Sequence, residues 1–390
     1  MRNRSQKGFA HLVLLLLIIA VAVGAVLLVA KHHSQQPKTS KAQTPQSISS
    51  QWSNGQCQGK GTVPLTNSPI SLNQLDSIAP MGNMVGDHVT PSDHLGFASV
   101  NPAQDTPIYA VAKGYVVQIE YTQEPQKSWY GLLIEHSCTF YSRQFLLSDL
   151  AEPFKSALGN HHSANVRMPV AAGQLIGSLR DHGLDYWLAD LDSELAFINP
   201  DRYANEAWKI HIVDPFNFYA EPLKSQLLAK DLREATPRGG SINYDAPGSL
   251  AGNWFKAGSQ LTQDAQKDAI NNLTFGYDFL DPRLIRISLG DYQGKASQFN
   301  AADNGPDPQT VKVGQLVKYG LVGSDYRLPN GQRWDRMHAA AGVTGFVNDQ
   351  LSGTMMVQLV SDRQLKLETF PGQTPASLND FTSAARIYER

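Results

Sequence analysis

Residues 106–117 read TPIYAVAKGYVV, and residues 170–177 read VAAGQLIG. In both stretches, short runs of Val, Ile, Leu and Tyr adjoin a glycine, a pattern typical of short strands joined by tight turns. Similar runs occur at 131–136 and 174–179, again bounded by Gly, Pro or Asn residues. We therefore predict that residues 52–235 form a mainly β domain.

Two segments of this region, 148–158 and 222–232, have apolar residues at helical spacing and are predicted to be helices. The turn PRGG at 237–240 indicates a domain boundary. Beyond it we predict a second all-β domain over 241–390, a barrel or a sandwich, with one helix at about 261–272. Its predicted strands are 274–279, 284–289, 315–321, 353–360 and 364–370.

The amino-terminal segment is a predicted membrane anchor. Arg2, Arg4 and Lys7 precede an unbroken apolar run from Leu12 to Ala30. A helix of about 20 residues spans a hydrocarbon core of about 30 Å, and basic residues before it favour a cytoplasmic amino terminus. A buried core helix rarely needs so many apolar residues, and a cleaved signal peptide carries only about 7–15. We expect contact with the membrane through residues 9–30.

Residues 1–31 are therefore predicted to be the cytoplasmic tip and anchor of a single-pass protein of the cell membrane. The bulk of the chain is then extracytoplasmic. Residues 32–51 are rich in Gln, Ser, Lys, Thr and Pro, so they bury too little apolar surface to offset the entropy of ordering. We predict a flexible stalk there.

Composition excludes some classes of partner. The chain has 42% hydrophobic and 17% charged residues and a formal net charge of −2, which gives no electrostatic reason to expect a nucleic-acid partner. The two cysteines, Cys57 and Cys138, are too few for a disulfide scaffold or a cysteine-based zinc site. In an extracytoplasmic domain a Cys57–Cys138 disulfide is chemically allowed, and two separate buried thiols are the alternative.

Between about residues 80 and 220 the chain resembles the lysostaphin-like zinc endopeptidases of peptidoglycan, which have the duplicated hybrid motif fold. The phrase at 106–117 is similar to that family's turn into the strand after the first metal ligands. The phrase at 170–177 is similar to its second glycine turn. The resemblance implies a lysostaphin-like β-sheet domain, so the expected fold is mainly β throughout, after a transmembrane helix.

The resemblance also directs attention to a set of candidate metal ligands. The family binds zinc with a His and an Asp that are separated by three residues. Here His88 and Asp93 have four residues between them, and His94 is adjacent to Asp93. Together with Asp185, these side chains could hold zinc through a mixed set of His and carboxylate ligands. The alternative is that Asp93 accepts backbone N–H groups in a turn.

Positions that carry catalytic histidines in the family have lost them here. Leu146 stands at one such position, and the family's His-x-His pair is matched by Asp185 and Trp187, whose side chains share one face of a strand. We predict that Tyr186, Trp187 and His136 lie at a binding groove. Hydrolysis by zinc needs about three protein ligands, an open position for water and a group that moves protons.

The second domain begins with Gly252-Asn253-Trp254. This start resembles that of lipocalin-type barrels, in which the tryptophan closes the base of the barrel. Aromatic residues of this domain could line a ligand cavity, and core packing is the alternative reading.

Taken together, the sequence predicts a prokaryotic-type envelope protein whose peptidase-like domain is inactive and acts in binding or scaffolding. The expected partner is a wall glycan or peptide, or another envelope protein, and no cofactor is expected. One alternative is an active zinc peptidoglycan endopeptidase with rearranged ligands. Another is a carrier of a small apolar ligand in the C-terminal barrel.

Overall fold

The computed structural model describes residues 43–390 except 125–126, 263–264 and 337–338. The predicted membrane span and most of the predicted stalk lie outside the described residues. Within the part of the chain that is described, no helix is long and apolar enough to cross a membrane.

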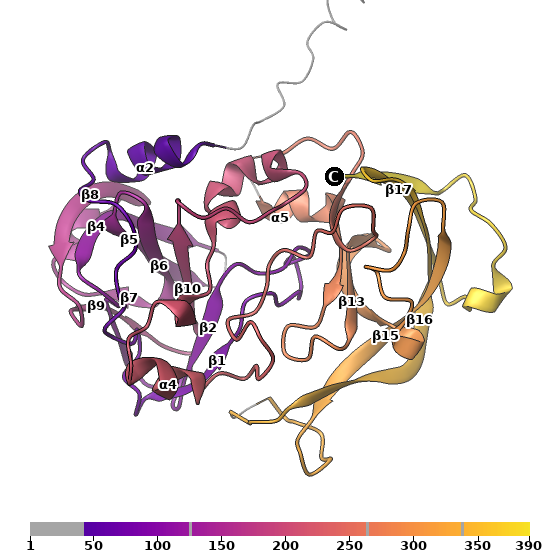
Figure 1. The fold of residues 1–390 in the computed structure, drawn as a ribbon. Coiled ribbons are helices and arrows are strands. Elements are labelled where there is room, and N and C mark those ends of the chain that lie inside the picture. The colour runs from indigo at the N-terminus through magenta and orange to yellow at the C-terminus, as the bar shows by residue number, and fades with distance from the viewer. Residues whose placement is uncertain (1–42, 125–126, 263–264, 337–338) are drawn as a thin grey trace, which may run out of the picture. The chain divides into compact units, whose positions relative to one another are not determined.

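The first half of this part is built on a seven-stranded antiparallel sheet with the strand order β1-β2-β10-β6-β5-β4-β8 (Figure 1). A three-stranded sheet, β3-β9-β7, accompanies it. The strands are β1 (Leu75–Ala79), β2 (Leu95–Ser99), β3 (Thr106–Tyr109), β4 (Gly114–Gln123), β5 (Ser128–Ser137), β6 (Phe140–Leu147), β7 (Asp149–Leu150), β8 (Ser163–Val170), β9 (Leu175–Leu179) and β10 (Leu184–Asp190).

The two phrases that predicted this domain lie where strands of the two sheets meet. The phrase at 106–117 supplies β3 and the start of β4, and the one at 170–177 supplies the end of β8 and most of β9. Val116 and Ile119 of β4 are fully buried in the core of this domain. The strand prediction is therefore confirmed here, with a turn dividing the first phrase into two strands.

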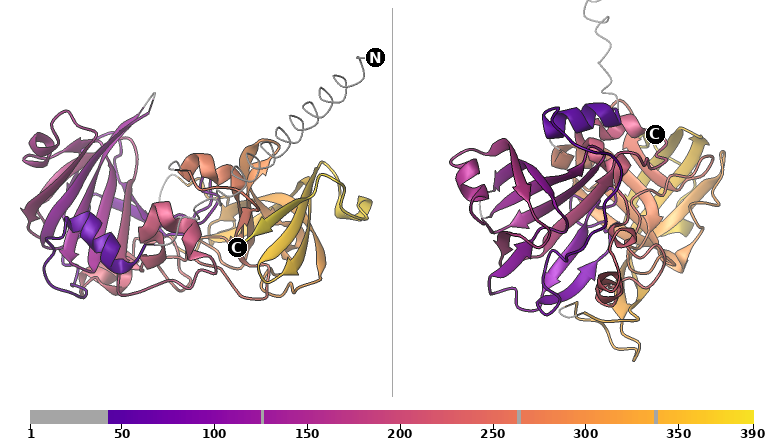
Figure 2. Two further views of the ribbon diagram at one scale, coloured as in Figure 1. Left: turned by 90° about the horizontal axis from the view of Figure 1, so that it is seen from above. Right: turned by 60° about the vertical axis from the view of Figure 1, so that its left-hand side comes forward.

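The second half is a closed antiparallel barrel in which each strand pairs with the next along the chain and β18 pairs with β11 (Figure 1 and Figure 2). Alternate residues of one strand, Ile285, Ile287 and Leu289, are buried in its core. The second domain is therefore a barrel and not a sandwich. Its strands are β11 (Gly252–Lys256), β12 (Asn272–Tyr277), β13 (Ile285–Tyr292), β14 (Lys295–Ala301), β15 (Leu316–Arg327), β16 (Thr344–Ser361), β17 (Gln364–Pro371) and β18 (Arg386–Glu389).

The sheet and the barrel have separate main hydrophobic cores, although they belong to one compact unit. Phe255 of β11 packs in the core of the sheet domain, beside the ring of Tyr203 at a centroid distance of 6.0 Å. The side chain of Asn253 also donates a hydrogen bond of 2.7 Å to the hydroxyl of Tyr203.

The predicted helices are present but shorter than expected. The helix predicted at 148–158 is reduced to α3 (Phe154–Leu158), because the chain just before it pairs with β9 as β7. The one at 222–232 is reduced to α4 (Leu223–Leu228), and the one at 261–272 to α5 (Ala265–Asp268) and the 3-10 turn η3 (Ala269–Asn271). The 3-10 segment η1 (Pro200–His211) and the short 3-10 turn η2 (Pro215–Asn217) had not been expected.

The carboxyl end of the predicted stalk is also corrected, because helix α2 (Pro45–Ser53) occupies it. Thr44 caps this helix by accepting a hydrogen bond from the Ser47 N–H, and Pro45 stands at its first turn. Ile48 is 1% exposed, and the ring of Trp52 packs edge-on against another aromatic ring of the sheet. Burial of these two side chains stabilises a helix in a polar segment.

A disulfide joins Cys57, just after α2, to Cys138, between β5 and β6, across 81 residues of sequence. Replacing both cysteines with serine is expected to lower the free energy of unfolding by about 2–4 kcal/mol, because the unfolded chain loses a constraint on a long loop. Urea denaturation of the full chain measures this loss. A reductant should destabilise the wild type and leave the double variant unchanged. Equal unfolding midpoints for the wild type and the double variant would contradict the prediction.

Candidate functional site

The candidate site lies where strands β2 and β10 run side by side (Figure 1). Asp93 and His94 immediately precede β2, and the register places Asp185 of β10 opposite Gly96. His94 therefore lies between two carboxylates. Its Nδ1 is 3.0 Å from Asp93 Oδ1, and its Nε2 is 3.5 Å from Asp185 Oδ2.

The segment η1 supplies the rest of this site. The indole N–H of Trp208 donates a hydrogen bond of 2.7 Å to Asp93 Oδ2. Lys209, which is 8% exposed, pairs with Glu206 at 3.1 Å and lowers the pKa of Asp93 by its positive charge. We refer to Asp93, His94, Asp185 and Trp208 as the His94 network.

The charges of the network favour an ion pair between Asp93 and His94. Burial lowers the pKa of His94, but the hydrogen bond with Asp93 and the charge of Asp185 outweigh burial, so the pKa of His94 is raised. Burial also raises the pKa of Asp93, but the hydrogen bond with His94 and the charge of Lys209 bring that pKa well below its usual range. The imidazolium form of His94 and the ionised form of Asp93 thus stabilise each other.

Two neighbouring groups shift toward their neutral forms. Burial raises the pKa of Asp185, and the positive charge of His94 offsets this only in part. Burial lowers the pKa of His88, and the charges of His94 and Lys209 lower it further. The ring of His88 lies 5.6 Å from the ring of His94, edge-on.

The structure brings all four candidate metal ligands into one neighbourhood, but it does not arrange them as a metal site. A His ligand needs a ring nitrogen with a free lone pair, and both nitrogens of His94 face carboxylates. Both oxygens of Asp93 are already hydrogen-bonded, to His94 and to Trp208. Over the described ranges of the chain, no group of three or more His, Cys, Asp or Glu side chains could hold a metal ion. These residues do not fit zinc.

The prediction that Tyr186 and Trp187 line a groove is wrong. Tyr186 is fully buried and packs against the ring of Phe97 at a centroid distance of 5.8 Å. Trp187 is 5% exposed and is stacked on Trp208, with the ring planes 8° apart, while Trp52 lies at 6.0 Å from it. Tryptophans from α2 and η1 therefore cover the place where the groove was expected.

His136 has a structural role. Its two ring nitrogens are 2.8 Å from the carbonyl oxygen of Lys113 and 2.8 Å from the hydroxyl of Ser142. Burial lowers the pKa of His136 to about 4, so the ring is neutral at physiological pH. A neutral His with both nitrogens bonded belongs to the packing of β5 against β6 and is not a groove residue.

Sequence reasoning missed Trp208, Lys209 and Trp52. Trp208 and Lys209 lie in the 3-10 segment η1, where no helix was predicted, and Trp52 lies in helix α2, at the first residue of the predicted β domain. The signal that could have found the two tryptophans is a large aromatic side chain in polar surroundings, which is typical of residues that pack against a distant element. Lys209 had no such signal.

No protein-family model matches this chain, and no curated protein matches its sequence. Among solved structures, it is similar to the SpoIIQ–SpoIIIAH pore-forming complex, with 13% identity, coverage of 42% of this chain and 96% of that chain, and a TM-score of 0.27. It is similar to lysostaphin, an antimicrobial peptidase from Staphylococcus simulans, with 13% identity, coverage of 84% and 92%, and a TM-score of 0.26.

A third similar structure is a zinc-containing peptidase from Vibrio cholerae, with 18% identity, coverage of 32% of this chain and 36% of that chain, and a TM-score of 0.20. These structures agree with the lysostaphin-like resemblance that the sequence predicted.

Proposed function

We propose that this chain is an extracytoplasmic binding protein of the cell envelope, anchored by its amino-terminal apolar segment, whose peptidase-like domain does not hydrolyse peptidoglycan. The apolar run from Leu12 to Ala30, with basic residues before it, supports the anchor and the location. The expected ligand is a component of the cell wall.

One observation carries the proposal that hydrolysis is absent: both ring nitrogens of His94 face protein carboxylates. The raised pKa of His94 favours the form in which both nitrogens are protonated, and that form has no lone pair for a metal.

The interior of the barrel does not favour the alternative of an apolar-ligand carrier. Trp254, Phe275, Tyr319 and Met355 are fully buried in its core, together with branched aliphatic side chains from most of its strands. These aromatic residues support core packing, which was the alternative reading of their role.

An assay with purified peptidoglycan sacculi tests this function. The full chain is expected to sediment with the sacculi and to release no more soluble wall fragments than a buffer control, equally with added zinc and with a chelator. A supporting control is the His94→Ala variant, which should release as little as the wild type. Zinc-dependent release of wall peptides by the wild type would overturn the proposal, and so would a failure to sediment.

A further inference from the structure

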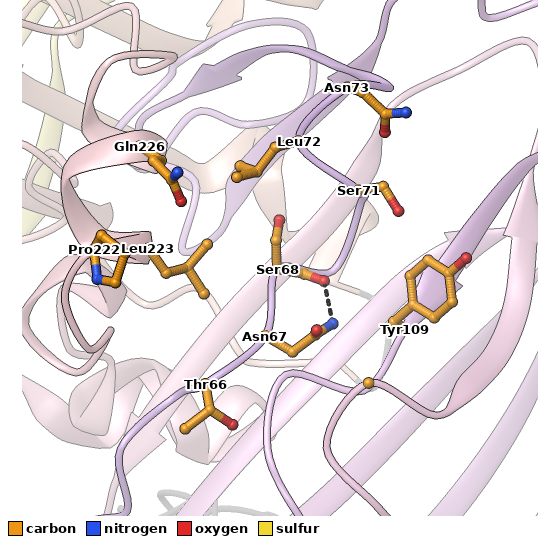
Figure 3. Close-up of a pocket in the computed structure, with 11 residues that line it drawn as sticks. Thr66, Asn67, Ser68, Ser71, Leu72, Asn73, Tyr109, Pro222, Leu223 and Gln226 are labelled. Atoms are coloured by element: carbon orange, nitrogen blue, oxygen red, sulfur yellow. Dashed lines mark hydrogen bonds between the residues drawn. The ribbon is translucent and has the colours of Figure 1, made fainter.

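A hollow on the sheet domain is formed by residues outside the His94 network (Figure 3). The loop before β1, the end of β3 and the start of α4 enclose it, and its volume is about 560 Å³. Sites for small molecules have volumes of about 300–1,000 Å³, so the hollow is large enough for a ligand.

The lining of this hollow is uncharged and combines polar side chains with apolar ones. None of its eleven residues is Asp, Glu, Lys, Arg or His. Ser68 and Ser71 contribute hydroxyl groups, and Asn67 and Gln226 contribute amides. In Figure 3, Tyr109 stands on one side of the hollow and Leu223 of α4 on the other.

Ser68 is the residue that points most directly to a ligand. It is 6% exposed, and its hydroxyl oxygen is buried without a hydrogen-bond partner. In Figure 3 this hydroxyl points away from Asn67 and toward Leu72, on the wall of the hollow. Buried hydroxyls are nearly always paired, so an unpaired one at a cavity wall indicates a position where a ligand atom completes the bond.

The neighbouring amide is held in place by the backbone. Asn67 Nδ2 donates a hydrogen bond of 2.7 Å to the carbonyl oxygen of Ser68. On its other side, the turn at Gly173 approaches so closely that a Cβ there would lie 3.3 Å from Asn67 Oδ1. Since Gly173 also has a φ of +74°, a larger residue is disfavoured on both counts. An amide fixed in this way is preorganised for recognition.

We infer that this hollow binds a neutral saccharide, an inference that rests on the proposed envelope function and specifies its ligand. Sugar hydroxyls donate and accept hydrogen bonds, as Ser hydroxyls and the amides of Asn and Gln also do. The apolar face of a sugar ring packs against the ring of Tyr109, whose own hydroxyl remains available for a hydrogen bond. The absence of charge from the lining disfavours a charged wall peptide or a phosphate, which would lose hydration without gaining an ionic partner.

Calorimetric titration of the full chain with chitotetraose, a neutral oligomer of N-acetylglucosamine, tests this inference. Wild-type protein is expected to bind it, and Ser68→Ala and Tyr109→Ala to weaken binding at least tenfold. Gln226→Ala changes an exposed residue of α4 and provides a variant that leaves the core intact. Tyr121→Ala is the matched control, because Tyr121 is a half-buried tyrosine of β4 whose ring lies 5.0 Å from that of Tyr130, outside the hollow.

The outcomes separate this inference from the function on which it rests. Absence of chitotetraose binding by a chain that sediments with sacculi would overturn the saccharide site and leave the envelope function standing. Binding that is equally strong in the wild type and in all three hollow variants would also overturn it. Weaker binding in those variants, with Tyr121→Ala like the wild type and a charged stem peptide unable to compete, would support it.

Discussion

Replacing Arg390 with alanine is expected to lower the free energy of unfolding by about 3–5 kcal/mol. Its guanidinium donates its three shortest hydrogen bonds to the carbonyl oxygens of Ala251 at 2.6 Å, Ser249 at 2.8 Å and Ala246 at 3.0 Å. It also lies 4.0 Å over the ring of Trp254, which is fully buried. Removing the side chain leaves these carbonyls without their charged donor, at a cost of about 1–3 kcal/mol for each group that water does not reach.

The position of Arg390 explains why one side chain has so large an effect. The three carbonyls belong to the segment that leads into β11, while Arg390 follows β18, the strand that pairs with β11 to close the barrel. Burial lowers the pKa of Arg390 to about 10, so the guanidinium is still charged at neutral pH. The residue therefore ties the first and last strands of the barrel together over the buried ring of Trp254.

Urea denaturation of the full chain measures the effect, and two variants provide controls. Arg390→Lys keeps the charge without the planar fork of donors and should have an intermediate stability. Arg386→Ala removes an exposed arginine that pairs with Asp291 and should cost less than about 1 kcal/mol. If Arg390→Ala were no less stable than Arg386→Ala, closure of the barrel by Arg390 would be refuted.

Much of the fold could be predicted because strands leave a local signal. The runs at 284–289 and 364–370 predicted β13 and β17 to within a few residues, since apolar side chains alternate along a strand that has one buried face. The closed barrel could not be told from a sandwich. That distinction depends on whether β18, a strand of four residues, pairs with β11, and a local pattern does not reveal it.

For the helices, in contrast to the strands, local patterns were a poor guide. The apolar spacing at 148–158 predicted a helix, but hydrogen bonds between β7 and β9 took precedence over that local preference in its first half. In α2, a flexible stalk was predicted because the burial of Ile48 leaves no signal in a polar segment. A short polar helix is stable only when such tertiary contacts exist.

The candidate site was predictable in part for a related reason. Asp93 and His94 could be placed near Asp185 because the resemblance implied which strands are neighbours, and β2 and β10 do pair. The contact between Trp208 and Asp93 joins residues 115 positions apart, and a local pattern does not reveal a contact over such a separation. That contact determines whether the cluster can hold a metal, and only the tertiary structure contains it.

Removal of the His94 side chain is the second change for which we expect a large effect, about 3–5 kcal/mol for His94→Ala. Asp93 and His94 are mostly buried, with side chains 13% and 19% exposed. Taking one partner out of a buried ion pair leaves the other charge uncompensated, and such losses are typically of this size. Because Trp208 still donates to Asp93 in this variant, the expected loss is that of the pair and not of the whole network.

The dependence on pH identifies the charge of His94 as the cause. The pKa of His94 is higher in the folded protein than its value of 6.5 in the unfolded chain. The stabilisation by His94 is therefore fully present below pH 6.5 and is lost as pH rises through the pKa of the folded protein. The lowered pKa of Asp93 means that its stabilisation is present above 3.8 and is lost as pH falls through its folded value. The pair should therefore contribute most between about pH 4 and pH 6.5.

The His94→Gln variant keeps a hydrogen-bond donor of similar size but cannot be charged. Comparing its stability with that of the wild type therefore isolates the contribution of the charge of His94. The stability advantage of the wild type over His94→Gln should be largest near pH 5 and should shrink toward pH 9. His136→Gln is the matched control with the opposite sign, because the lowered pKa of His136 makes its stabilisation present above 6.5 and lost as pH falls toward about 4. If the advantage over His94→Gln were the same at pH 5 and pH 9, His94 would act as a neutral hydrogen-bonding group, and a ring nitrogen would be available for the chemistry that the ion pair excludes.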